Sequence, residues 1–301
     1  MNLKVDIAGV TLNNPIIAGS GTFGFGVEMS KFYDLHLLGG LASKAVTLHK
    51  RDGNPSPRIA EVTSGILNAV GLQNPGVDGF LAEELPRMKT YGTRIIVNVA
   101  GSTEEEYVAV LEKLQGSGID MVELNISCPN VKQGAMAFGT SPESVASITR
   151  LCKEACDVPL MVKLTPNVTD IVSIAQAAEQ AGADALSLIN TLTGMAVDVQ
   201  TRRPILANIT GGMSGPAIKP IALRMVYQVS RAVSIPIVGM GGITSGTDVV
   251  EFLLCGANAV TVGTGNLMTP TACTDICEEL RAFMQEQGVK DVNDLVGALQ
   301  I

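Results

Sequence analysis

Eight short, strongly apolar runs recur along this chain and limit its fold more than any other feature. They cover residues 15–18, 41–46, 94–99, 121–125, 160–164, 185–189, 236–239 and 259–262. The runs do not alternate between apolar and polar residues, as expected of parallel strands that are buried on both faces. Because amphipathic segments separate most of them, the pattern predicts a closed (β/α)8 barrel, the TIM barrel. A doubly wound open sheet is the alternative.

Helix-start signals between the runs support this alternation. Residues 102–105 read as a capping box, Ser141 precedes a proline at a first helical position, and Ser245 pairs with Asp248. Residues 3–12 predict a short N-terminal β-hairpin. The longer connections are expected as inserted loops at the C-terminal face of the barrel.

Composition limits the class of protein and its partners. Residues 1–301 contain no linker, repeat or low-complexity segment, so we expect one domain. A net charge of −8 argues against a nucleic-acid partner. No apolar run reaches the ~18 residues of a membrane span, and the N-terminus lacks the basic and apolar regions of a signal peptide. We therefore expect a cytoplasmic protein with no membrane partner.

The cysteines give no sign of a metal site. Cys152 and Cys156 fall four residues apart on one predicted helix, and Cys273 and Cys277 repeat that spacing on another. Without nearby histidine or CxxC partners, they read as packed or surface thiols in a reducing compartment. The two histidines of the chain lie outside every recognisable motif, and we assign them no catalytic role.

Polar or glycine residues follow nearly every apolar run, at the end where barrels of this kind carry their chemistry. The residues at these ends are Ser20, Lys44, Asn98, Asn125 with Cys128, Lys163, Asn190, Gly241-Gly242 and Gly263-Thr264. Two lysines, three asparagines and one thiol would therefore meet at a single rim. Such a ring predicts a pocket for a small, polar, planar ligand.

Three glycine-rich segments point to a phosphate group. Residues 239–243 and 263–266 follow the seventh and eighth predicted strands, where barrels commonly bind phosphate through backbone N–H groups. Residues 211–216 are predicted to form a third glycine loop just before a helix, whose N-terminus favours an anion. Lys163 would lie across the barrel mouth from the phosphate.

Long motifs in this order resemble those of the dihydroorotate dehydrogenases, specifically the catalytic subunit of the class 1B enzymes. The resemblance covers essentially the whole chain. Its markers include SKAVTL around Lys44, ILNAVGLQNPG at 66–76, NISCPNVKQG at 125–134, VKLTPN around Lys163, LINTLTGMAVD at 188–198, GGMSGPAIKP at 211–220, GMGGI and VGTGN.

The resemblance implies a barrel that binds FMN and oxidises dihydroorotate to orotate in pyrimidine (UMP) biosynthesis. The residues matching FMN positions are Ser20, Lys44, Ala45, Asn98, Asn125, Lys163, Ile189, Gly215, Gly241, Gly242, Gly263 and Thr264. The residues matching the substrate pocket are Lys44, Asn68, Ala69, Val70, Gly71, Leu72, Asn125, Asn130, Asn190 and Thr191. Asparagine amides both donate and accept, which suits the alternating C=O and N–H edge of a pyrimidine.

The resemblance also assigns the lone thiol at the end of the fourth run. Cys128 is implied as the catalytic base, which removes a proton from C5 while hydride leaves C6 for flavin N5; class 2 relatives use serine there. Lys163 would favour the anionic reduced flavin. The loop at residues 132–140 is a candidate lid. It carries Gly134-Ala135 where a glycine pair is expected, which could alter the mobility of the loop but not the chemistry.

The electron acceptor is implied to lie outside this chain. Class 1B enzymes use a separate subunit with FAD and a [2Fe–2S] cluster, which passes electrons to NAD+; a homodimer of barrels with two such subunits makes a heterotetramer. The cysteine spacing here lacks a ferredoxin pattern, in agreement. The alternatives are a class 1A-like enzyme using fumarate, a dihydropyrimidine dehydrogenase, an FMN-dependent isomerase and a binding subunit without activity.

Overall fold

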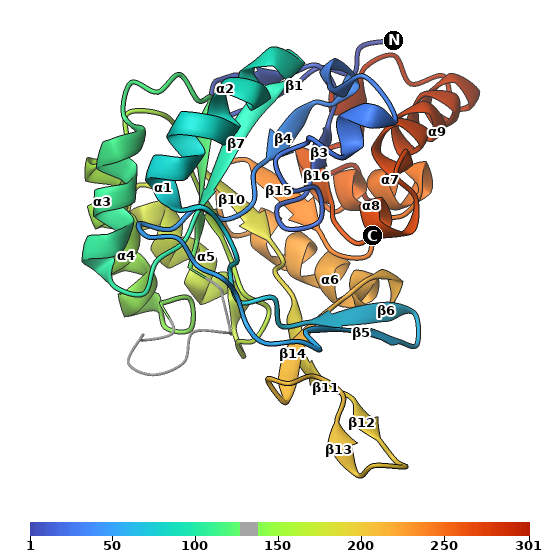
Figure 1. Ribbon diagram of the computed structural model, residues 1–301. Coiled ribbons are helices and arrows are strands. Elements are labelled where there is room, and N and C mark those ends of the chain that lie inside the picture. The colour runs from blue at the N-terminus through green and yellow to red at the C-terminus, as the bar shows by residue number, and fades with distance from the viewer. Residues whose placement is uncertain (127–137) are drawn as a thin grey trace.

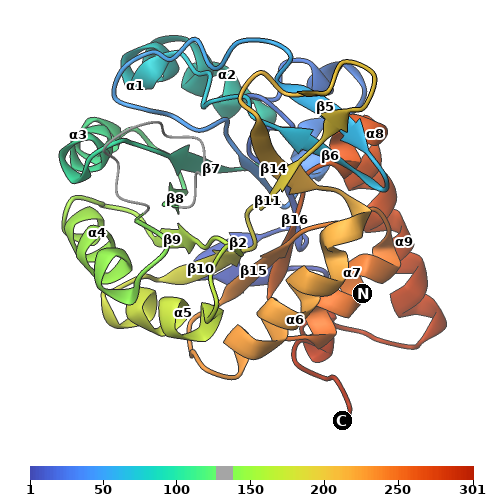
Figure 2. The ribbon, with the colours of Figure 1, turned by 90° about the horizontal axis from the view of Figure 1, so that it is seen from below.

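Eight parallel strands close into a barrel at the centre of the molecule, and helices surround it (Figures 1 and 2). The structure is a computed structural model that describes residues 1–126 and 138–301. In order around the barrel, the strands are β3 (Ile16–Ala18), β4 (Gly40–Ala42), β7 (Arg94–Val99), β8 (Met121–Asn125), β9 (Leu160–Lys163), β10 (Ala185–Leu188), β15 (Ile237–Met240) and β16 (Ala259–Val262). The predicted (β/α)8 barrel is therefore confirmed, and the open sheet is excluded.

Each of the eight predicted apolar runs contributes one barrel strand, with small shifts at the ends. The strand in the run 236–239 begins at Ile237, because Pro236 has no amide hydrogen to give to a neighbouring strand. In the run 41–46 the regular strand stops at Ala42, although Val46 still forms a bridge to Val99 of β7. Full burial on both faces explains why these runs read as continuously apolar.

The helices pack against the outside of the barrel (Figure 2). The longer ones are α3 (Glu104–Leu114), α4 (Pro142–Glu154), α5 (Ile171–Gln180), α6 (Lys219–Ser230), α7 (Gly246–Leu254) and α9 (Ala272–Glu286). The short ones are α1 (Gly76–Gly79), α2 (Leu85–Met88) and α8 (Gly265–Met268), a π-turn at Phe80–Glu84, and 3-10 turns at Met29–Lys31, Leu35–Leu37, Lys89–Tyr91, Pro216–Ile218 and Val292–Leu295.

Two of the three predicted helix starts are confirmed, and one is shifted. Ser141 caps α4, and Ser245 forms a reciprocal capping box with Asp248 at the start of α7. The box predicted from Ser102 is wrong by one residue. Thr103 has the extended backbone that a cap requires, and its hydroxyl accepts from the amide of Glu106.

Two antiparallel additions flank the barrel. The predicted hairpin forms from β1 (Val5–Ile7) and β2 (Val10–Leu12), at the end of the barrel opposite its C-terminal face (Figure 1). The inserted segments at the C-terminal face form a sheet in the order β11-β14-β6-β5, which Figure 2 shows over the barrel mouth. Its strands are β5 (Ile59–Val62), β6 (Gly65–Asn68), β11 (Leu192–Met195) and β14 (Thr210–Ser214), and a hairpin of β12 (Val197–Asp198) and β13 (Arg203–Pro204) extends from it.

The segment 211–216 was predicted as a glycine loop, and this is wrong for its first four residues, which belong to β14. A Cβ on Gly211 would lie 2.7 Å from the carbonyl oxygen of Asn68, and one on Gly212 would lie 2.0 Å from Oγ1 of Thr191. The glycines therefore allow β14 to approach its neighbours closely, rather than to turn. Only Gly215, with φ of 105°, makes the turn that precedes α6.

The cysteines of the described residues are free thiols, as predicted. Cys152 is buried on α4, whereas Cys156 lies just beyond the end of that helix rather than on it. Cys273 and Cys277 are buried on α9. Over residues 1–126 and 138–301, no helix is both long and apolar enough to cross a bilayer.

Candidate active site

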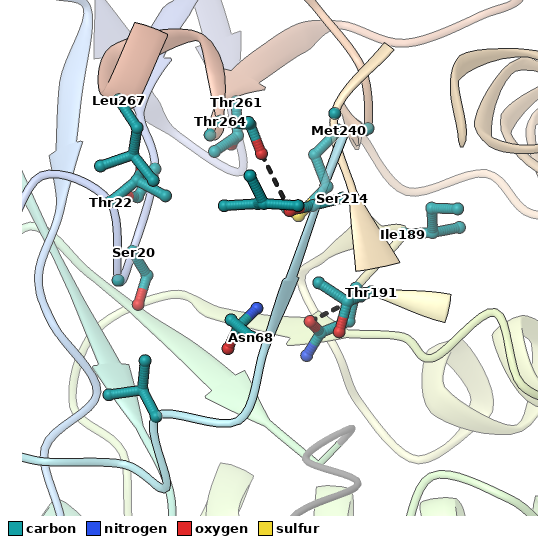
Figure 3. Close-up of a pocket in the computed structure, with 18 of the residues that line it drawn as sticks. Ser20, Thr22, Asn68, Ile189, Thr191, Ser214, Met240, Thr261, Thr264 and Leu267 are labelled. Atoms are coloured by element: carbon teal, nitrogen blue, oxygen red, sulfur yellow. Dashed lines mark hydrogen bonds between the residues drawn. The ribbon is translucent and has the colours of Figure 1, made fainter. Parts of the chain in front are cut away.

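The C-terminal mouth of the barrel holds a large cleft that most of the predicted site residues line. It encloses about 1250 Å³ of space not filled by protein, its open mouth included. The predicted residues in its wall are Ser20, Lys44, Ala45, Asn68, Val70, Gly71, Leu72, Asn125, Lys163, Ile189, Asn190, Thr191, Gly215, Gly241, Gly242, Gly263 and Thr264. Figure 3 shows Ser20, Asn68 and Thr191 facing this space.

Two of the predicted site residues that the structure describes are not in this wall. Ala69 is fully buried in a small apolar cluster beside the four-stranded sheet, and its backbone bonds to Asn54 and Arg58. Asn98 is also fully buried, and it lies beneath Asn125. Cys128 and Asn130 lie outside the described residues, as do Gly134 and Ala135 of the candidate lid.

Lys44 gives the cleft a half-buried cation. Burial lowers the pKa of its ammonium group, and the nearby positive charge of Arg58 lowers it further. A bound anion would relieve both effects, because it would compensate the lost hydration and the like charge. Lys44 is therefore suited to hold a carboxylate or an electron-rich ring.

Lys163 forms an ion pair that the sequence reading missed. Its Nζ lies 3.3 Å from Oε2 of Glu123, and the side chains are only 8% and 1% exposed. Glu123 also accepts from Ser187 Oγ at 2.9 Å and from Asn98 Nδ2. A charged residue in a fully buried parallel strand needs a partner, so the glutamate within MVELN (residues 121–125) was the signal that could have found it.

The polar wall of the cleft is built from amides on three different segments. Asn68 ends β6, and its Nδ2 donates to the carbonyl oxygen of Gly212 on β14 at 3.4 Å. Asn190 Oδ1 accepts from the amide of Thr191 at 2.7 Å. The pairing of β6 with β14 thus brings Asn68 beside Gly212 at the barrel mouth, although these two residues lie 144 positions apart in the chain.

Glycine loops form the other side of the cleft, as the sequence predicts for a phosphate. Gly241 and Gly242 have φ of 128° and 76°, a conformation that side chains rarely adopt. A Cβ on Gly242 would lie 2.8 Å from Cβ of Lys219. Thr264 donates through Oγ1 to Ser214 Oγ at 2.9 Å across the same side (Figure 3). This wall of backbone amides and hydroxyls fits the phosphate of a mononucleotide.

The end of β8 is anchored firmly beside this cleft. The hydroxyl of Tyr107 donates to the carbonyl oxygen of Asn125 at 2.8 Å, and the ring of Phe138 meets Tyr107 edge-on with centroids 5.8 Å apart. A Cβ on Gly139 would lie 2.8 Å from the carbonyl oxygen of Ile126. The described residues next to the segment 127–137 therefore pack at the end of β8.

Comparisons with known proteins identify the family of this chain. A family model described as dihydroorotate dehydrogenase matches residues 2–284. The chain is 58% identical to "Dihydroorotate dehydrogenase B (NAD(+)), catalytic subunit" of Anoxybacillus flavithermus over 98% of this chain and 95% of that protein. It is 54% identical to proteins of the same name from Alkaliphilus metalliredigens, over 99% of each chain, and Caldicellulosiruptor saccharolyticus, over the full length of both. A barrel with this cleft and these relatives belongs to the dihydroorotate dehydrogenase family.

Proposed function

We propose that this chain oxidises dihydroorotate to orotate at the barrel mouth, with FMN bound in the same cleft. The observation that carries the proposal is the convergence of Lys44, Lys163 and three asparagines opposite a glycine-lined wall. The name of the relatives supports the same reaction. FMN, when bound, supplies the acceptor for the hydride that leaves the substrate.

Some residues of the cleft wall would bind the cofactor, and others would bind the substrate. Gly241, Gly242, Gly263 and Thr264, with Gly215 nearby, would hold the phosphate through backbone amides and a hydroxyl. The remaining cofactor contacts would come from Ser20, Ala45, Asn125, Ile189 and the two lysines. Asn98 would support Asn125 from beneath the cleft. Lys163 would place positive charge against the flavin ring.

The substrate would lie against the amides at the open end of the cleft. Asn68, Asn125, Asn130 and Asn190 offer donors and acceptors for the ring, with Thr191 and residues 70–72 completing the wall. Lys44 would bind the carboxylate, which distinguishes dihydroorotate from dihydrouracil. A preference for dihydrouracil would move the chain to the dihydropyrimidine dehydrogenases.

Cys128 would act as the base that removes the proton from C5. A thiolate is the basic form of cysteine, with an ordinary pKa of about 8.5. Flavin reduction should therefore accelerate as pH rises toward the pKa of this thiol. Cys128→Ala should slow reduction by about two or more orders of magnitude while FMN stays bound, and Cys128→Ser should restore little. A parent rate in the alanine variant would remove Cys128 from this role.

Alanine substitutions of Lys163 and Asn68 should impair different properties of the protein. Lys163→Ala should impair FMN retention or reduction with every electron donor. Asn68→Ala should mainly weaken the binding of dihydroorotate and orotate, because the polar groups of the substrate lose one hydrogen-bond partner. Equal damage to both properties in both variants would argue against this division.

A partner subunit would carry the electrons onward to NAD+. The words "catalytic subunit" in the names of the relatives support a partner, and FAD with a [2Fe–2S] cluster in it would suit NAD+ reduction. Burial raises the pKa of the Cys152 thiol and raises that of Cys273 to about 12, so these thiols are poor cluster ligands. Among the described residues, no group of three or more His, Cys, Asp or Glu could hold a metal ion.

Steady-state assays test this arrangement. The isolated chain, as a homodimer, should turn over dihydroorotate with artificial acceptors but hardly with NAD+. Adding the electron-transfer subunit should restore NAD+ reduction in a heterotetramer. Brisk turnover with fumarate by the chain alone would instead support a class 1A-like enzyme.

A further inference from the structure

Glu123 occupies a position in the barrel interior where a charged residue is unusual. The interior layers of such barrels are mostly filled by branched aliphatic side chains, and buried carboxylates are costly unless they are paired and hydrogen-bonded. Glu123 is 1% exposed on β8, beneath the cleft and outside its wall. Ion pairing and hydrogen bonds compensate both of its oxygens.

The strand register explains how these partners meet. Glu123 pairs in register with Asn98 of β7, while Lys163 of β9 pairs with Asn125 of β8 and with Ser187 of β10. Four neighbouring strands therefore bring their polar side chains together around Glu123. Lys163 alone of the three direct partners of Glu123 also reaches the cleft wall.

A chain of amides leads from Glu123 to the substrate wall. Asn98 donates through Nδ2 to Glu123, and its Oδ1 accepts from Asn125 Nδ2 at 3.3 Å. Asn125 Oδ1 in turn lies 3.5 Å from Asn190 Nδ2, and Asn190 Oδ1 accepts from the backbone amide of Thr191. Every side-chain amide in this series turns its NH2 group toward Glu123 and its oxygen away.

The carboxylate supplies the physical reason for this common direction. An ionised carboxylate only accepts hydrogen bonds, so Asn98 must present its NH2 group to Glu123. The oxygen of Asn98 then accepts from the NH2 group of Asn125. The oxygen of Asn125 in turn faces the NH2 group of Asn190. One charged group thus selects among amide orientations that are otherwise similar in shape.

We propose that Glu123 is a positioning residue that sets the donor and acceptor directions of Asn125 and Asn190 and offsets the charge of Lys163. This inference rests on the proposed function, in which those amides bind the substrate ring and Lys163 faces FMN. Two separable effects follow. The charge of Glu123 would tune the FMN potential through Lys163, and its acceptor atoms would tune the affinity for orotate through the amides.

Two substitutions separate the charge from the acceptor atoms. In Glu123→Gln, the amide oxygen can occupy the position of Oε2 and accept from Asn98 and Lys163, while the NH2 group donates to Ser187, whose hydroxyl can turn. This variant loses the charge but keeps a hydrogen-bond partner for Asn98, Lys163 and Ser187. Glu123→Leu removes the acceptors as well, so the direction of the amide series is no longer fixed.

The experiment uses the FMN-loaded chain and two readouts besides activity. The midpoint potential of bound FMN is measured by dye equilibration, and the dissociation constant of orotate is measured from its perturbation of the flavin spectrum. Glu123→Gln should bind orotate within about threefold of the parent. Its reduction equilibrium should shift about tenfold toward reduced flavin, a rise of about 30 mV, because Lys163 is no longer offset. Glu123→Leu should raise the dissociation constant of orotate about tenfold or more.

The control is Glu179→Gln on α5. Glu179 accepts from the backbone amide and the hydroxyl of Ser234 at 2.7 and 2.9 Å, outside the cleft wall, and both readouts should stay at parent values. A parent-like potential in Glu123→Gln, or a parent-like orotate affinity in folded Glu123→Leu, would overturn the inference. A parent chain that retains no FMN or binds no orotate would instead overturn the proposed function, which keeps the two failures distinct.

Discussion

Removing the ammonium group of Lys163 should destabilise the FMN-free chain strongly, because it leaves Glu123 charged and buried. In Lys163→Met the carboxylate keeps its bonds from Asn98 and Ser187 but loses its only paired cation among the described residues. Breaking a buried ion pair in this way costs about 3–5 kcal/mol. The two remaining donors favour the lower end, about 3 kcal/mol.

This loss converts into a measurable shift. With 301 residues and about 2.1 cal/mol/K of unfolding entropy per residue, 3 kcal/mol lowers the melting temperature by about 5 °C. Urea unfolding, followed by circular dichroism, should show a lower midpoint at an unchanged slope. The double variant Lys163→Met with Glu123→Gln should recover at least half of the loss, since no unpaired charge remains.

The matched control is Lys153→Met. Lys153 pairs with Asp184 at 2.6 Å, but these side chains are 38% and 30% exposed, so the loss should be at most about 1 kcal/mol. A Lys163→Met variant that is no less stable than Lys153→Met would refute the reasoning. So would an undiminished loss in the double variant.

Three further predictions concern the cleft and its support. The pKa of Lys44 lies below its ordinary value of 10.5. Orotate affinity should fall as pH rises through this lowered pKa, because only the ammonium form attracts the carboxylate. Binding titrations of Lys44→Met should not show this fall. Gly212→Ala should weaken orotate binding about tenfold, since its Cβ would lie 2.0 Å from Thr191 Oγ1. Gly194→Ala in the same sheet should bind orotate normally, because its Cβ would lie 3.0 Å from a Leu67 methyl and 3.7 Å from Met213 Cβ. Burial acts to raise the pKa of Asp248, but hydrogen bonds from Lys219 and the Thr244 amide outweigh burial and lower the pKa. The stability that this shift gives the fold is present above the ordinary carboxyl pKa and is lost as pH falls through the lowered pKa. Acid unfolding of Asp248→Asn should therefore be less steep than that of the parent.

The barrel strands and the polar residues at their C-terminal ends could be predicted because each depends on a short stretch of the sequence. Strands buried on both faces require continuous apolar runs, and parallel topology then brings their C-terminal ends together. Lys44, Asn125 and Lys163 could therefore be placed at one mouth from the sequence alone. Chain order was enough for this part of the site.

The four-stranded sheet could not be predicted in the same way. It joins residues 59–68 to residues 192–214, and its glycines at 211 and 212 look locally like a turn. Their role is visible only from what lies opposite them, Asn68 and Thr191. Long-range pairing, not local preference, decides this segment.

Glu123 was missed for a related reason. Its residue type and its buried strand were both visible in the sequence, but its partners come from β7, β9 and β10. Which charged and amide groups share one layer depends on the register of the barrel strands. That register is set by the closure of the barrel and not by any single strand.

The most direct test of the whole account is an anaerobic titration of the FMN-loaded chain with dihydroorotate, followed by the absorption of the flavin. Dihydroorotate should bleach the flavin rapidly, dihydrouracil should not, and Cys128→Ala should retain FMN but bleach far more slowly. A flavin that stays oxidised with dihydroorotate, or that dihydrouracil reduces in preference, would contradict the account.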